Sequence, residues 1–73
     1  MVTVKIRADA IREVAARQNL SLSEIAKSSG IEASYFAALL RGKHQPSPRM
    51  RLRLLSALGL KFDELFVLSR TEP

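Results

Sequence analysis

The residues of this sequence best suited to binding a ligand are five basic side chains in one short stretch. The stretch spans positions 41 to 53, contains no acidic residue, and carries Arg41, Lys43, Arg49, Arg51 and Arg53. Ammonium and guanidinium groups bind phosphate oxygens, and arginine does so with a planar pair of donors. The whole chain has 12 Lys and Arg against 7 Asp and Glu, a formal net charge of +5. This balance indicates a polyanionic partner.

The sequence offers little to an enzyme or a metal. It has no cysteine and one histidine, His44, and its 7 carboxylates are scattered along the chain. Such a set does not form a soft or borderline metal site, and no nucleophile stands beside a base. No glycine-rich phosphate loop is present. We therefore expect a protein that is not an enzyme and that has no metal or cofactor.

A chain of 73 residues is long enough for one small domain with a marginal core. Since the chain has no cysteine for disulfides, additional stability for such a core would come from a second subunit. We expect an N-terminal extension at 1–8, a domain at 9–68 and a C-terminal tail at 69–73. No apolar run approaches the roughly 20 residues of a membrane span, and the alternating start lacks the apolar block of a secretory signal. We expect a soluble, intracellular protein with no membrane partner.

The elements that position the basic stretch begin with a strand and a helix. Residues 2–6 alternate apolar and polar side chains, which is the period of a β-strand. A lone strand is not stable, so its partner is either residues 66–68 or the same segment of a second chain. Apolar residues at helical spacing predict a first helix over 9–18, ending at Asn19.

A second helix starts at a capping box, in which Ser21 and Glu24 each satisfy a free amide of the first turn. It ends at Gly30, which tolerates a left-handed backbone and permits a sharp turn. The apolar residues that we expect it to turn inward are Leu22, Ile25 and Ala26.

Two more helices and a short turn complete the chain. The third helix is expected over 32–41, closed by Gly42, and a loop over 42–46 follows. Ser47 as N-cap and Pro48 at the first helical position open a fourth helix that ends at Gly59. A last short turn covers 62–66. The apolar stripe of the third helix is Tyr35, Phe36, Leu39 and Leu40.

Two short helices joined by a glycine turn form the plan of a helix-turn-helix. The run SLSEIAKSSGIEASYFAALLRGK over 21–43, followed by PSP over 46–48 and LLSALG over 54–59, resembles the Cro and phage-repressor family, also called XRE-type. The likeness covers about 11–66. It implies an all-α fold, a five-helix lambda-repressor-like domain, to which the short N-terminal strand would be added.

By the same resemblance the third helix enters the major groove of double-stranded DNA and the second lies against the backbone. Only Ser34 and Tyr35 on the outer face of the third helix can form hydrogen bonds, so sequence readout would lean on DNA shape as well. Glu32 stands where the family has Ser, Thr or Asp as the helix cap. The implied DNA-binding residues are Ser23, Lys27, Ala33, Ser34, Tyr35, Ala37, Ala38, Arg41, Lys43 and His44.

Apolar residues near the C-terminus exceed what one short helix can bury, which indicates a homodimer. The expected interface residues are Leu52, Phe62, Phe66 and Leu68. Two-fold pairing would set two recognition helices about 34 Å apart, one turn of DNA. The alternative is that these residues close the core of a single chain over its first seven residues.

These observations together favour a small, sequence-specific transcriptional regulator, such as a repressor, in the cytoplasm or nucleoid of a bacterium or encoded by a phage. The alternative is a helix-turn-helix module that binds a protein partner, such as an antitoxin or an assembly factor. The two differ in the surface they use, since a DNA reader depends on Tyr35 and Lys43. A protein adaptor depends instead on Leu52, Phe66 or Leu68.

Overall fold

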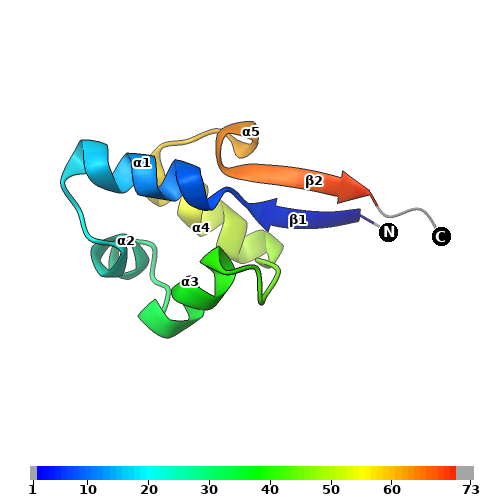
Figure 1. The fold of residues 1–73 in the computed structure, drawn as a ribbon, viewed down its shortest axis with the longest axis horizontal. Coiled ribbons are helices and arrows are strands. Elements are labelled where there is room, and N and C mark those ends of the chain that lie inside the picture. The colour runs from blue at the N-terminus through cyan, green and yellow to red at the C-terminus, as the bar shows by residue number, and fades with distance from the viewer. Residues whose placement is uncertain (1, 71–73) are drawn as a thin grey trace.

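The computed structural model describes residues 2–70, and within them it has five helices and a two-stranded antiparallel sheet (Figure 1). The elements are β1 (Val2–Ile6), α1 (Ala8–Gln18), α2 (Leu22–Ser28), α3 (Ala33–Leu40), α4 (Pro48–Leu58), α5 (Phe62–Leu65) and β2 (Phe66–Arg70). The expected helices are confirmed to within a residue or two at their ends. The fold is mostly helical with a small sheet, so it is not purely all-α, and the short N-terminal strand that was added to the expected five-helix domain is present. In the described part of the chain, no helix has the length and apolarity to cross a membrane.

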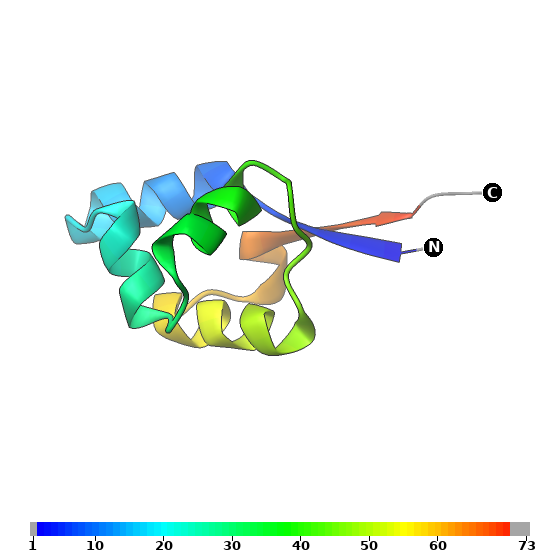
Figure 2. The same cartoon turned by 90° about the horizontal axis from the view of Figure 1, so that it is seen from below.

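The sheet joins the two ends of the described chain. β1 pairs with β2 in a register that runs from Val2 opposite Arg70 to Ile6 opposite Phe66. Of the two expected partners for β1, the stretch after α5 of the same chain is the one found. The ribbon projects from one end of the helical body (Figures 1 and 2), and the molecule measures 42 × 22 × 19 Å.

The start and end of α2 follow the expected local chemistry. The Glu24 amide donates to the Ser21 hydroxyl at 3.1 Å, and the Ser21 amide donates to the Glu24 carboxylate at 2.9 Å. This is the reciprocal capping box. At the other end Gly30 has φ +71°, and the Ile31 amide bonds to the Ala26 carbonyl at 2.8 Å. The left-handed glycine thus closes the helix and turns the chain toward α3.

α3 and α4 are joined by a loop that is tied at both ends. The Lys43 amide donates to the Ala38 carbonyl at 3.0 Å, and the Gly42 amide donates to that of Leu39 at 3.1 Å. This bond pair is the closing motif of a helix with a left-handed residue after its end. The Ser47 hydroxyl accepts from the Met50 amide at 3.2 Å and caps α4, as expected.

Every helix contributes to one core, which also takes in residues of both strands. Two expectations about it are wrong. Leu22 was expected to point inward, yet its side chain is 37% exposed. Phe66 was expected at a subunit interface, yet it is 1% exposed. Phe66 and Leu68 share one face of the ribbon, and Phe66 lies at the end next to the helices, so it fills the core of its own chain. The largest fully buried side chains are Phe36, Phe66, Ile11, Ile25, Leu39, Leu54 and Leu65.

The capping box gives the stability a pH dependence. The hydrogen bond from the Ser21 amide, and then that from the Ser21 hydroxyl, holds the pKa of Glu24 below its ordinary value. A carboxylate whose pKa is lower in the folded protein than in the unfolded chain stabilises the fold at pH values above the unfolded-state pKa. This stabilisation is lost as the pH falls through the folded-state pKa. Glu24→Gln retains a capping amide without the titration. We expect the wild-type stability advantage over Glu24→Gln in urea unfolding to shrink below about pH 4.5, and a constant difference would contradict this.

The position of Phe66 in the core gives a second prediction. Phe66→Ala removes a buried ring and should lower the free energy of unfolding by about 3 to 5 kcal/mol. Leu52→Ala is the matched control, since Leu52 is 68% exposed on α4 and its loss should change stability by less than about 0.5 kcal/mol. Urea unfolding of both variants at low protein concentration measures the difference, and equal effects would show that Phe66 is not a core residue.

Candidate nucleic-acid interface

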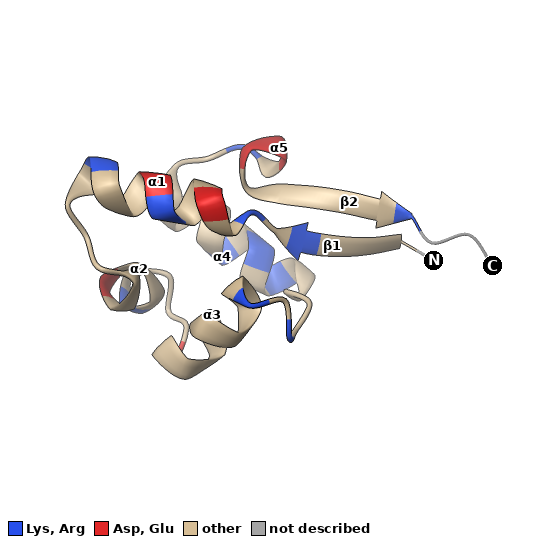
Figure 3. Cartoon of the chain, in the orientation of Figure 1, with Lys and Arg blue, Asp and Glu red and all other residues tan. Residues whose placement is uncertain are grey.

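The surface built by α3, the following loop and α4 has no acidic residue. Figure 3 shows acidic segments on α1, α2 and α5 and at the residue before α3, whereas the loop and α4 carry only basic ones. The sequence agrees, because Glu32 and Asp63 bound a stretch without Asp or Glu. Along these consecutive elements the basic charge is therefore not offset by a carboxylate of the same stretch. A field of one sign attracts a polyanion.

The outer face of α3 is small and weakly polar. Ala33 and Ser34 are exposed, and Tyr35 and Ala37 are half-buried. The Ser34 hydroxyl donates to the Glu32 carboxylate at 2.6 Å, so Glu32 binds this side chain and makes no cap bond to the helix. One of the two hydrogen-bonding groups expected to face a base is therefore engaged within the protein.

The expected exposure of Ala38 is wrong. Its side chain is 9% exposed and belongs to the core. The loop after α3 folds back on the helix at this point, where the Lys43 amide bonds to the Ala38 carbonyl. Burial of the methyl group removes Ala38 from the surface that a base could reach.

The loop after α3 is fixed on both sides. The imidazole of His44 stacks on the ring of Tyr35, with centroids 5.1 Å apart and an angle of 13° between the planes. The side-chain oxygen of Gln45 accepts from the Val4 amide at 3.3 Å. His44 is thus part of an aromatic pair with α3, a role that its surroundings in the sequence did not indicate.

Arg41 and Lys43 stand on either side of Gly42, and both are exposed. Within residues 2–70 the one ion pair is Arg17 with Glu13 at 2.7 Å, so both cations are free of carboxylates. Free cations on a fixed loop are available to external anions.

The arginines of α4 play a different part. The Arg51 guanidinium donates to the Pro46 carbonyl at 3.0 Å, and that of Arg53 donates to the Gly30 carbonyl at 3.5 Å. Arg53 thereby links α4 to the turn between α2 and α3. Both side chains support the framework, which the run of bases in the sequence did not reveal.

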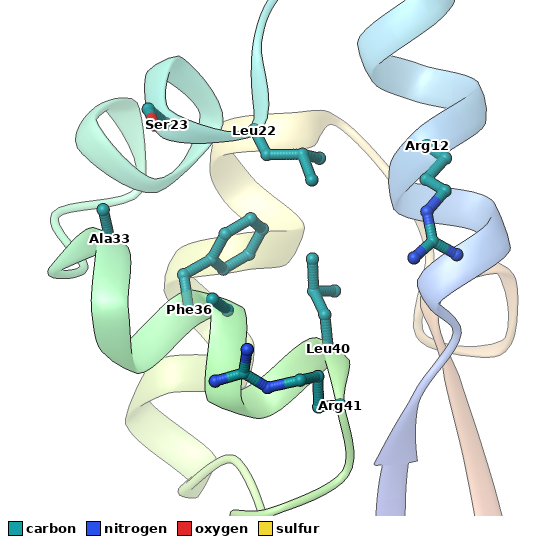
Figure 4. Close-up of a pocket in the computed structure, with 8 residues that line it drawn as sticks. Arg12, Leu22, Ser23, Ala33, Phe36, Leu40 and Arg41 are labelled. Carbon is teal, nitrogen blue, oxygen red and sulfur yellow. The ribbon is translucent and has the colours of Figure 1, made fainter.

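A cavity of about 240 Å³ gathers several of the expected residues (Figure 4). Four of them line it: Ser23, Ala33, Ala37 and Arg41. Lys27 is exposed in a different hollow of α2, beside Leu20 and Glu24. The cavity also contains Arg12 of α1 and Leu22 of α2, which sequence reasoning missed. No local signal marks Arg12, because only packing brings α1 beside α3.

The four expected interface residues do not form one surface. Leu52 lies in a groove with Arg49 and Arg53, and none of the other three lines that groove. Leu68 is 55% exposed on β2. The ring of half-buried Phe62 packs on that of the buried Phe66 with centroids 5.3 Å apart. No cluster of three His, Cys, Asp or Glu able to hold a metal is found among residues 2–70.

Comparisons with known proteins agree with the helix-turn-helix formed by α2, the turn at Gly30 and α3. The helix-turn-helix domain family matches residues 8–66. Two proteins of Archaeoglobus fulgidus, each described as an uncharacterised HTH-type transcriptional regulator, are 27% and 26% identical over 62 residues. The alignments cover 85% of this chain and 89% and 87% of theirs.

Among solved structures, the restriction-modification controller protein C.AhdI from Aeromonas hydrophila is similar in fold, with a TM-score of 0.67 and 30% identity. The match covers 78% of this chain and 86% of that one. C.AhdI is an XRE-like helix-turn-helix protein. The family match and this likeness bear out the resemblance in the sequence. The chain belongs to the helix-turn-helix domain family, in its XRE-like branch.

Proposed function

We propose that this protein is a transcriptional regulator that binds double-stranded DNA with α3 in the major groove. The observation that carries the proposal is the stretch from α3 through its loop, which contains no acidic residue and in which Arg41 and Lys43 are free of carboxylates. The descriptions of the related proteins as regulators support the same function. Phosphate contacts from the loop would set the register in which α3 enters the groove.

The small side chains of α3 define how it would recognise DNA. Ala33 and Ala37 let the helix approach the base edges closely and contact thymine methyl groups. The Ser34 hydroxyl is bound to Glu32, and Tyr35 is the remaining hydrogen-bonding group. With so few base-specific donors, the protein would select its site largely through the shape and deformability of the duplex.

We also propose that the protein acts as a homodimer through its ribbon. Three of the exposed large apolar residues, Val2, Val67 and Leu68, lie on β1 and β2. On the edge of β1 that faces away from β2, the Val4 amide is hydrogen-bonded to the Gln45 side chain. Within residues 2–70 no side chain from outside the ribbon bonds to the backbone of β2. An open apolar strand edge pairs readily with another strand. The edge that would pair with the second copy is therefore β2.

A protein partner is the second candidate function, and exposed Leu52 favours it. This side chain lies between Arg49 and Arg53 in a groove separate from the α3 surface. Pairing this groove with its own copy would bring arginines together, which is unfavourable. An acidic partner with an apolar anchor fits the groove better.

The DNA-binding function is tested by fluorescence anisotropy with a pool of random duplexes at about 50 and 200 mM salt, with sequencing of the retained pool. We expect salt-dependent binding and enrichment of a motif with two related half-sites. Binding without enrichment would restrict the function to shape or backbone recognition. Absence of binding at the lower salt would refute the proposal and favour a protein partner.

Lys43→Ala tests the loop, since it removes one free cation. We expect the slope of log K against log salt to become shallower by about 0.9, the value for one phosphate contact. Lys61→Ala removes the same charge before α5, on the side of the molecule away from α3 (Figure 1), and should leave the slope unchanged. Equal slopes for both variants and the wild type would exclude the loop from the interface.

Leu68→Glu tests the dimer. A carboxylate on β2 should prevent two apolar edges from pairing, so the variant should be monomeric. Sedimentation equilibrium at about tens of micromolar detects an association of about 6 to 7 kcal/mol or stronger. Leu52→Glu is the control, because it places the same charge in the separate groove of α4, and it should remain dimeric. A monomeric wild type under the same conditions would refute the dimer.

A further inference from the structure

The cavity between α1, α2 and α3 has two charged sides and an apolar floor (Figure 4). Leu22, Phe36 and Leu40 form the floor, and the guanidinium groups of Arg12 and Arg41 lie on opposite sides of it. Leu22 is 37% exposed, more than an apolar residue that points into the core would be. The cavity therefore offers positive charge and apolar surface side by side.

Neither arginine has a partner within the described chain. Among residues 2–70 the guanidinium groups of Arg12 and Arg41 make no hydrogen bond or ion pair, and the neighbouring carboxylate of Glu13 is bound to Arg17. Two like charges around one small cavity repel each other. An anion placed between them would remove this repulsion and accept hydrogen bonds from both guanidinium groups.

We propose that this cavity binds one nucleotide unit of the DNA backbone. Its phosphodiester group lies between Arg12 and Arg41, and its deoxyribose packs on Leu22 and Leu40. The apolar floor favours this ligand over a bare phosphate, because the deoxyribose of a nucleotide unit presents C–H groups next to the charged phosphate. The Ser23 hydroxyl at the rim is a further donor to a phosphate oxygen. This inference rests on the proposed DNA-binding function and adds α1 to its interface.

The shared phosphate has a quantitative signature in the salt dependence of duplex binding. Arg12→Gln and Arg41→Gln should each weaken binding, and the two changes together should reduce the salt slope by about 0.9, the value for one phosphate. Two independent phosphates would give about 1.8. Lys61→Gln, a loss of one charge before α5, is the control and should leave the slope unchanged. A wild-type affinity in Arg12→Gln, or a slope loss near 1.8 in the double variant, would overturn the proposal.

The sugar contact has a separate signature. Leu22→Ser removes apolar surface and no charge, so it should lower duplex affinity about fivefold with the salt slope unchanged. Circular dichroism checks that the variant remains folded. An unchanged affinity would overturn the assignment of a nucleotide unit. Inorganic phosphate at constant ionic strength should compete weakly, and equally, with duplex on the wild type and on Arg12→Gln.

The two proposals fail in different ways. If the wild type binds no duplex, the DNA-binding function fails. If the wild type binds duplex and Lys43→Ala reduces the salt slope while Arg12→Gln leaves the duplex affinity unchanged, the function stands and the nucleotide site on α1 is refuted. Selective competition by inorganic phosphate on the wild type would assign the cavity to a free phosphate and overturn the nucleotide assignment.

Discussion

The hydrogen bond from the Ile31 amide to the Ala26 carbonyl determines the direction in which α3 leaves α2. It forms because Gly30 adopts a left-handed backbone, and Ala26 at that point is small enough to be fully buried. The Arg53 guanidinium then binds the Gly30 carbonyl and ties the turn to α4. The placement of α3, its loop and the cavity beside α1 all depend on this turn.

Features set by neighbouring residues were predictable from the sequence. The capping box of Ser21 and Glu24, the Ser47 cap and the left-handed glycines depend on residues within a few positions of each other. The intrachain partner of β1 was also among the expected alternatives, because residues 66–68 have strand-forming side chains. Local chemistry thus fixes the ends of the helices and the order of the elements.

Features set by packing were not predictable in the same way. Ala38 is covered because the loop folds back, Phe66 is covered because the ribbon lies against the helices, and Leu22 faces a cavity made by three helices. Each depends on residues distant in sequence. The basic run shows the same limit, since Arg51 and Arg53 bind carbonyls of the framework while Arg41 remains free. Residues of one type and one charge thus divide between side chains bound to the framework and side chains left free.

The ribbon has a consequence for the order in which the protein forms during synthesis. β1 leaves the ribosome first, but its strand partner β2 follows all five helices. The helices make mostly local contacts and can begin to pack before β2 appears. Until then the edge of β1 that pairs with β2 has no strand partner. Closure of the ribbon therefore follows synthesis of the whole helical body and is the step that brings the two ends of the described chain together.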